Sequence, residues 1–252
     1  SSIVKAWPMK KRSVLILGGR SDIGRAISHQ FGRAKYEIFL AARDVGSLKH
    51  DQQDLMIRYG VSVYLYEFDA LNIESHKDFV NSLKSLPDVV VSSIGYLGEQ
   101  VESEQDTLEA VRVMRSNYEG PASIFSELAN KFEERKSGTL IGISSVAGAR
   151  GRGSNYIYGS AKSGFTSFLS GLRNRLNKSK VNVITVLPGY VETKMTKALK
   201  LPKLLTISAD TLAESIFKAV GRNQDFVISK RWLFIIIILQ FIPEKIFKRL
   251  SL

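Results

Sequence analysis

The stretch SVLILGGRSDIG, residues 13–24, decides the fold class of this chain. It opens with a largely apolar run, residues 13–17, of the kind found in strands that are buried on both faces. Gly18 follows this run, where it can make a tight turn, and Gly24 lies where helical periodicity begins, where a glycine lets a helix pack closely on a sheet. A strand, a glycine-rich turn and a helix in this order direct backbone N–H groups at a phosphate, so the stretch predicts a nucleotide-binding loop.

The alternation of strand and helix continues along the chain. Short apolar runs predict strands at residues 13–17, 37–41, 61–68, 88–92, 139–143, 181–187 and 226–228. Segments with helical periodicity lie between them, at residues 23–33, 45–59, 76–86, 107–134, 156–177 and 210–220. This pattern indicates an α/β fold, a doubly wound parallel sheet with helices on both faces and ligands at the carboxyl ends of the strands. We expect one such Rossmann-type domain over residues 10–230 and a C-terminal tail over residues 231–252.

Composition and charge exclude several classes of function. The chain has 252 residues, of which 44% are apolar and 24% charged, as in a folded globular protein, and it has no cysteine. A disulfide framework, an iron–sulfur cluster and a cysteine nucleophile are therefore excluded, and the histidines, His29, His50 and His76, lack paired ligand spacing, so no metal site is predicted. The net charge of +12 favours phosphate-bearing ligands or anionic lipid. Nucleic acid is not expected, because the cations are spread along the chain.

The end of the second predicted strand reads FLAAR, residues 39–43, and indicates which dinucleotide binds. A carboxylate at this place binds the 2′-hydroxyl of NAD, whereas an arginine accommodates the 2′-phosphate of NADP. Arg43 stands here, and Arg20 in the glycine-rich loop adds a second cation that can reach the same phosphate. We therefore predict NADP(H) in preference to NAD(H). The alternative for each arginine is a solvated surface charge.

The stretch YGSAK, residues 158–162, carries the sharpest chemical signal. Tyr158 and Lys162 are four residues apart, so on a helix they lie on one face, one turn apart. A phenol with a pKa of ~10 is a poor acid–base catalyst at neutral pH, and a neighbouring ammonium would lower that pKa. Tyr156 has Ser160 at the same offset and lacks such a partner. Tyr158 is therefore the candidate acid–base residue.

Taken together, these motifs resemble the short-chain dehydrogenase/reductase family over nearly the whole chain. By this resemblance Ser145, thirteen positions before Tyr158, is the serine that holds a carbonyl oxygen, and Asn117 positions a water in a proton relay. Lys162 is implied to bind the nicotinamide ribose and to lower the Tyr158 pKa. The implied activity is hydride transfer between a nicotinamide and a carbonyl or alcohol carbon, an oxidoreductase reaction in which the cofactor supplies the hydride.

The motifs and the resemblance together give a set of cofactor-binding residues. The set is Gly18, Arg20, Ser21, Ile23, Gly24, Arg43, Asp69, Ser93, Gly95, Tyr158, Lys162, Pro188, Gly189, Val191 and Thr193. Asp69 is implied to approach the adenine, and Val191 and Thr193 the nicotinamide carboxamide and a nearby phosphate. The chain departs from the motifs usual in the family at two places, which leaves its subfamily open. Asp22 replaces a loop glycine, and SSIG, residues 92–95, replaces Asn-Asn-Ala-Gly. A carboxylate beside a pyrophosphate is unfavourable unless it turns away, for example to cap the helix that starts there.

The tail is both apolar and basic. Residues 232–242 read WLFIIIILQFI, ten of the eleven being apolar, and the segment 230–252 carries five basic residues and one acidic residue. Such a run is too short to span a bilayer, and it suits either an interfacial membrane anchor or an oligomer interface. On a narrower set of features, the tail and the loop GGRSDIG, the chain is similar to the keto-reductase subunits of decaprenylphosphoryl-ribose 2′-epimerases. That resemblance implies a keto-sugar carried on a polyprenyl phosphate.

Three functional hypotheses remain open at this point. The first is an NADP(H)-dependent ketone reductase for a hydrophobic, lipid-linked keto-sugar, in the cytoplasm and in peripheral contact with the cytoplasmic face of a membrane. The second is a reductase for a small soluble carbonyl compound, whose tail serves a homo-oligomer, a dimer or a tetramer. The third is a non-catalytic NADP-binding scaffold protein, which would normally have lost Tyr158, Lys162 or Ser145. A lid over the substrate is expected between Thr193 and Ile207, with Met195 and Leu199 among its apolar residues.

Overall fold

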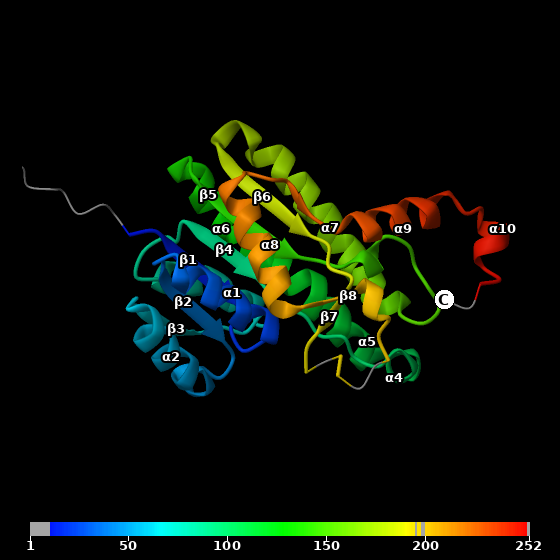
Figure 1. Ribbon diagram of the computed structural model, residues 1–252, viewed down its shortest axis with the longest axis horizontal. Coiled ribbons are helices and arrows are strands. Elements are labelled where there is room, and N and C mark those ends of the chain that lie inside the picture. Colours follow the sequence, from blue (N-terminus) through cyan, green and yellow to red (C-terminus); the bar gives the residue numbers. More distant parts are fainter. Residues whose placement is uncertain (1–10, 195, 198–199, 251–252) are drawn as a thin grey trace, which may run out of the picture.

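The computed structural model describes residues 11–194, 196–197 and 200–250. Its main sheet has seven strands, all parallel, in the order β3-β2-β1-β4-β5-β6-β9 (Figure 1). These strands are β1 (Ser13–Leu17), β2 (Glu37–Ala42), β3 (Val63–Glu67), β4 (Val89–Ser92), β5 (Gly138–Ile143), β6 (Val181–Val186) and β9 (Phe226–Val227). The strand order reverses between β1 and β4, the place where an open α/β sheet binds its ligand. The predicted doubly wound fold is confirmed.

Helices cover both faces of the sheet, as the continuous apolar strands require. One face is covered by α1 (Asp22–Arg33), α2 (Lys49–Tyr59) and α8 (Ala209–Gly221). The other is covered by α3 (His76–Ser82), α6 (Gly120–Arg135) and α7 (Tyr156–Leu176). Alternate residues of β1 serve the two layers: Val14 and Ile16 pack with the first group of helices, and Leu15 and Leu17 with the second.

The structure departs from the predicted elements in several places. The helix predicted over residues 107–134 consists of α5 (Thr107–Met114), a π-helical turn (Arg115–Glu119) and α6. Pro121 has no N–H to donate to the carbonyl of Asn117, which interrupts the regular ladder at this turn. Helix α4 (Gln100–Gln105) and a small parallel sheet of β7 (Tyr190–Glu192) and β8 (Thr206–Ser208) were not expected. Short 3-10 turns occupy Val45–Leu48, Ile73–Ser75, Val146–Gly148, Asn177–Ser179 and Lys203–Leu205.

The apolar run of the tail forms helix α9 (Lys230–Phe241), which is followed by the short helix α10 (Glu244–Phe247). Both helices lie at one end of the molecule, beyond the carboxyl ends of the central strands (Figure 1). No residue of α9 is buried. Across the part of the chain that the structure describes, none of the helices combines the length and the apolar character needed to cross a membrane.

Candidate active site

The glycine-rich loop between β1 and α1 is held closed by two serines. The Ser93 hydroxyl lies 2.9 Å from the Leu17 carbonyl oxygen and 3.0 Å from that of Gly18, and the Ser21 hydroxyl donates to Ser93 at 3.1 Å. Gly18 has a φ of +83°, which favours glycine, and a Cβ on Gly24 would lie 2.5 Å from the Gly18 carbonyl oxygen. The close approach of loop and helix therefore depends on both glycines.

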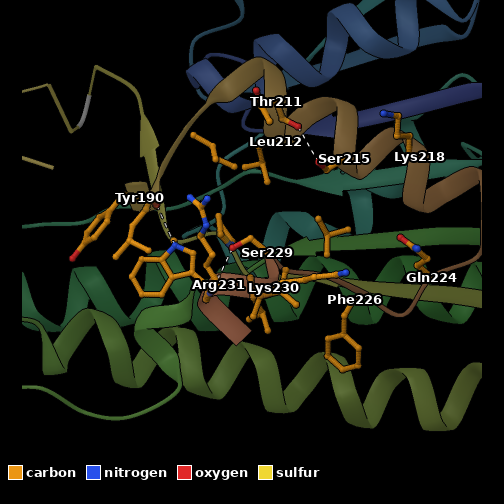
Figure 2. A pocket seen from close by; sticks show the side chains of 18 of the residues that line it. Tyr190, Thr211, Leu212, Ser215, Lys218, Gln224, Phe226, Ser229, Lys230 and Arg231 are labelled. Carbon is orange, nitrogen blue, oxygen red and sulfur yellow. Dashed lines mark hydrogen bonds between the residues drawn. The ribbon is translucent and has the colours of Figure 1, made fainter. Parts of the chain in front are cut away.

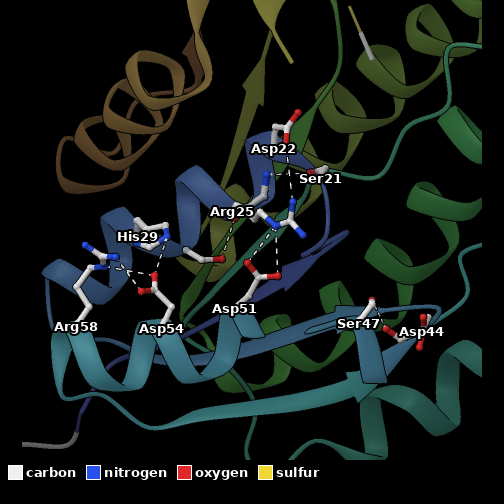
Figure 3. Close-up of polar contacts among 11 residues, drawn as sticks. Ser21, Asp22, Arg25, His29, Asp44, Ser47, Asp51, Asp54 and Arg58 are labelled. Carbon is white, nitrogen blue, oxygen red and sulfur yellow. Dashed lines mark hydrogen bonds and ion pairs between the residues drawn. The ribbon is translucent and has the colours of Figure 1, made fainter. Parts of the chain in front are cut away.

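Asp22, the residue that departs from the family pattern, lines the active-site cavity and binds the segment that follows β7. The cap of α1 is Ser21, which accepts a hydrogen bond from the Gly24 N–H at 2.8 Å, so the suggested capping role of Asp22 is wrong. The Asp22 carboxylate instead accepts from the Lys194 N–H at 2.6 Å and faces Arg25, which pairs with Asp51 (Figure 3). Asp22 thus joins the loop to the segment that follows β7.

A cavity of about 370 Å³ collects the residues predicted for the adenosine end of the cofactor. Arg20 and Arg43 both line it and both are exposed, so two guanidinium groups can meet one phosphate there. Asp69 lines the same cavity and accepts a hydrogen bond from the Leu71 N–H at 2.9 Å. Arg112 also lines it, stacked over the Tyr96 ring, and nothing in the local sequence pattern pointed to this third arginine.

A second cavity, of about 420 Å³, lies at the carboxyl ends of the central strands. The predicted residues that line it are Arg20, Ser21, Ile23, Ser93, Gly95, Ser145, Tyr158, Lys162, Pro188, Gly189, Val191 and Thr193. The two cavities adjoin, and we call them together the groove: Arg43 lines only the first and Tyr158 only the second, and the residues that line both are Arg20, Ser21, Ser93, Ile94, Gly95 and Tyr96. This groove and its donors fit a dinucleotide: a glycine cradle, a helix N-terminus and cations at one end.

Helix α7 brings Tyr158 and Lys162 to the wall of the second cavity. The Lys162 ammonium donates to the Ile143 carbonyl at 3.0 Å and is almost completely buried. The Ser144 hydroxyl lies 2.9 Å from the Lys162 carbonyl oxygen and 2.6 Å from the Thr166 hydroxyl, which fixes α7 against the end of β5. Sequence reasoning missed Ser144 because its neighbour Ser145 carries the family motif.

Asn117 lies behind the wall of the cavity, in the π-helical turn. Its side chain is fully buried and donates to the carbonyl oxygens of Tyr96 at 2.6 Å and Val113 at 2.8 Å. A Cβ built on Gly95 would lie 3.2 Å from the Asn117 amide oxygen and 3.6 Å from the Lys162 ammonium. Gly95 therefore leaves the space between these two polar groups open, which is where a relay water would have to lie.

The pKa of Tyr158 differs from the sequence prediction in direction. The sequence predicts a pKa lowered by Lys162, but burial raises the pKa of Tyr158 to about 12, opposed only in part by a hydrogen bond with Ser145. Burial also lowers the pKa of Lys162 to about 8. The reason is desolvation, which disfavours the charged form of each group. Tyr158 is thus a phenol that holds its proton at neutral pH.

Comparison with known proteins gives the family. The family model for short chain dehydrogenases matches residues 12–203. An uncharacterized oxidoreductase of Mycobacterium tuberculosis is 32% identical over 217 residues, which cover 85% of this chain and 86% of that protein. The chain belongs to the short-chain dehydrogenase family. It is therefore an oxidoreductase by descent as well as by the geometry of its groove.

Two solved structures share the short-chain dehydrogenase fold at low sequence identity. A short-chain dehydrogenase from Sphingobium yanoikuyae in complex with NADPH is 20% identical, with a TM-score of 0.76 over 92% of this chain and 97% of that one. A variant of actinorhodin polyketide ketoreductase with NADPH is also 20% identical, with a TM-score of 0.75 over 85% of this chain and 94% of that one. These likenesses support the assignment of the overall fold.

The lid predicted for this short-chain dehydrogenase is only partly described. The segment 203–208 forms a 3-10 turn and strand β8, which pairs with β7. Met195 and Leu199 lie outside the described residues. Thr193 lines the cavity, and its N–H donates to the Thr196 hydroxyl at 3.0 Å, which gives the chain a turn directly after β7.

Proposed function

We propose that this chain is an NADP(H)-dependent carbonyl reductase in which Ser145, Tyr158 and Lys162 act on a ketone. The observation that carries the proposal is the groove of two adjoining cavities, one lined by Tyr158 and Lys162 and the other by Arg43, with Arg20 lining both. The NADPH complexes among the similar structures favour the same cofactor. A scaffold role is disfavoured because the side chains required for chemistry line the cavity.

The cofactor would be held by residues of this groove. The loop from Gly18 to Gly24 would take the pyrophosphate, Arg20 and Arg43 the 2′-phosphate, and the segment 188–193 the nicotinamide. NADPH supplies a hydride to the carbonyl carbon when it is bound. The carbonyl oxygen gains the proton of the Tyr158 phenol, while the Ser145 hydroxyl orients that oxygen, and the products are the alcohol, NADP⁺ and a Tyr158 phenolate.

The raised pKa of Tyr158 suits reduction, because the phenol is fully protonated before the reaction and a proton donor is what a ketone requires. The buried Lys162 ammonium stabilises the phenolate that remains. Asn117, Gly95 and Lys162 surround the space through which a water can return a proton to the phenolate. The Tyr158 phenol therefore holds the proton before the reaction, and the relay returns a proton to it after each turnover.

We further propose that the substrate is a keto-sugar on a polyprenyl phosphate and that helix α9 contacts the membrane that carries it. The outward face of α9 is the apolar stripe formed by Leu233, Phe234, Ile237, Ile238 and Phe241, which we call the outer stripe and whose members are 44% to 82% exposed. Their spacing places them on one side of the helix. Lys230 and Arg231 precede the stripe and Lys245, Lys248 and Arg249 follow it, a charge pattern that suits an anionic lipid surface.

The reductase proposal is tested by NADPH oxidation with purified protein and a panel of ketones, which includes a polyprenyl-phosphate keto-pentose and its water-soluble sugar phosphate. We expect NADPH consumption with the lipid-linked ketone to exceed that with the soluble one. Consumption with none of the ketones would contradict the reductase. A preference for the soluble compound would contradict the lipid-linked substrate alone.

The membrane contact is tested by sedimentation with vesicles of phosphatidylcholine and phosphatidylglycerol. Phe234→Asp in the outer stripe should release the protein from the vesicles, whereas Ile57→Asp on α2, which is equally apolar and 86% exposed, should not. The competing hypothesis is a second copy of the chain on the outer stripe. Under that hypothesis the wild-type chain elutes as a dimer in size-exclusion chromatography, binds no vesicles and becomes a monomer in Phe234→Asp. That result would contradict the lipid contact and assign the outer stripe to an oligomer interface.

A further inference from the structure

The first turn of α9 contacts two segments, the residues between β6 and β7 and the 3-10 turn that precedes β8. The Trp232 indole N–H donates to the Leu205 carbonyl at 3.2 Å, and its ring packs edge-on against Tyr190 with ring centroids 5.4 Å apart. A Cβ built on Gly189 would overlap the indole, so the indole fills the space that this glycine leaves. Arg231 adds a hydrogen bond to the next lid carbonyl, that of Leu204, at 2.8 Å.

The backbone that Trp232 touches also forms a wall of the active site. Pro188 and Gly189 line the active-site cavity on one side and, on the other, a cavity of about 620 Å³ that Trp232 borders. Figure 2 shows the 620 Å³ cavity, with Tyr190 and Arg231 at the end where α9 begins. A shift of the indole therefore acts on the backbone that is expected to hold the nicotinamide.

The far end of α9 is held by Arg150, from the segment between the catalytic candidates Ser145 and Tyr158. Its guanidinium donates to the carbonyl oxygens of Leu239 and Ile242, the latter at 2.6 Å, and pairs with the Glu244 carboxylate at 2.8 Å. It also stacks over the Phe247 ring at 3.7 Å. The Arg150 side chain is only 17% exposed, whereas its partner Glu244 is 74% exposed, so the ion pair lies at the surface and the contacts with the backbone carbonyls are partly buried.

We propose that α9 couples the binding of an anionic lipid surface to the active site, through Trp232 at one end and Arg150 at the other. The proposal rests on the lipid contact proposed above and adds a regulation of the same site. The outer stripe of α9 is exposed and its opposite side, with Ile235, Ile236 and Leu239, is only half-buried, so these two attachments help to set its position, and lipid bound to the outer stripe would act on both. One attachment acts on the segment 188–189 and the other on the segment between Ser145 and Tyr158.

A coupling of this kind must be reciprocal, which makes it measurable without knowing the substrate. We would measure the Kd of NADPH with and without phosphatidylglycerol vesicles, and the vesicle partition coefficient with and without saturating NADPH. The expected result is that each ligand changes the affinity of the other by the same factor, about fivefold or more. Arg150→Met should keep both separate binding events and reduce this factor to the part carried by the Trp232 attachment, since α9 then loses one of its two attachments.

The matched control is Arg152→Met, which removes a cation from the same segment while the contacts of Arg150 remain; it should keep the wild-type factor. Arg150→Lys should restore only part of the factor, because an ammonium cannot donate to two carbonyls and a carboxylate in the planar arrangement of a guanidinium. Vesicle binding with no change in NADPH affinity would overturn the coupling and leave the reductase and its lipid contact intact. No vesicle binding by the wild-type chain would overturn the coupling together with the lipid contact, and NADPH-dependent reduction would still stand.

Discussion

The ammonium of Lys162 lies 5.7 Å from the centre of the Tyr158 ring, one helical turn away along α7. At this separation both groups share one cavity wall, yet burial changes their pKa values in opposite directions, raising that of Tyr158 and lowering that of Lys162. Each group is thereby pushed towards its neutral form. This direction of the two pKa values supports the proposed role of Tyr158 as the proton donor to a ketone.

Replacing the phenol should abolish turnover without affecting the cofactor. Tyr158→Phe should reduce kcat by about 10²- to 10⁴-fold, because general acid catalysis is worth that much, and should leave the Kd of NADPH within about twofold. Tyr156→Phe is the matched control, since Tyr156 begins the same helix and is 46% exposed. Steady-state kinetics and an NADPH titration of both variants check this. Near-normal turnover of Tyr158→Phe would remove the residue from the mechanism.

The paired arginines should separate NADPH from NADH. Arg43→Ala should raise the Kd of NADPH roughly tenfold or more, which corresponds to the free energy of one hydrogen bond to a charged group. The Kd of NADH should stay nearly unchanged. Arg20→Ala should show the same selectivity. Fluorescence titration with both nucleotides measures it, and NADH serves as the internal control. An equal loss for both nucleotides would mean that neither arginine contacts the 2′-phosphate.

Lys162 should make stability depend on pH in the alkaline range. Its pKa falls from 10.5 in the unfolded chain to about 8 in the folded protein, so between these values the unfolded chain binds more protons. The free energy of unfolding should therefore rise as the pH is raised from about 8 towards 10, by up to about 3 kcal/mol. Tyr158 acts at higher pH: its raised pKa stabilises the folded state below pH ~10, and this contribution is lost as the pH approaches 12.

Urea denaturation of the wild-type chain and of Lys162→Met at several pH values checks the contribution of Lys162. The variant should lack the rise between pH ~8 and 10, because the buried ammonium has been removed. Lys131, on α6 and exposed, offers the control Lys131→Met, which should retain the rise. The same rise in Lys162→Met would assign it to another group.

A methyl group at Gly189 should displace the tail. Gly189→Ala should lower the melting temperature and expose Trp232, because a Cβ there overlaps the indole. Trp232→Ala should in turn make Gly189→Ala nearly neutral, so the two changes should be strongly non-additive. Thermal unfolding of both single variants and of the double variant tests this interaction. Additive effects would show that the indole does not rest on Gly189.

The sequence alone predicted the class of the fold and a set of candidate site residues, most of which line the two adjoining cavities. The apolar runs and glycine spacing of residues 13–24 predicted a parallel sheet with a nucleotide loop, and the offset between Tyr158 and Lys162 predicted that they share a helix face. These features are local: each depends on residues within one element or one turn, where backbone periodicity fixes geometry. Gly18, Arg20 and Arg43 were singled out for the same reason, since they follow the ends of predicted strands, and Gly24 stands where a predicted helix begins.

Tertiary structure decided what depends on distant segments. The direction of the Tyr158 pKa follows from how deeply α7 is buried, which no spacing of residues reveals. The attachments of α9 join Trp232 to Gly189 and Arg150 to Ile242, pairs separated by 43 and 92 residues in the sequence. Composition identified residues 232–242 as an apolar run in a basic tail but could not place it beside the active site. A local pattern determines which side chains share a face, whereas desolvation and long-range packing arise only when the whole chain has folded.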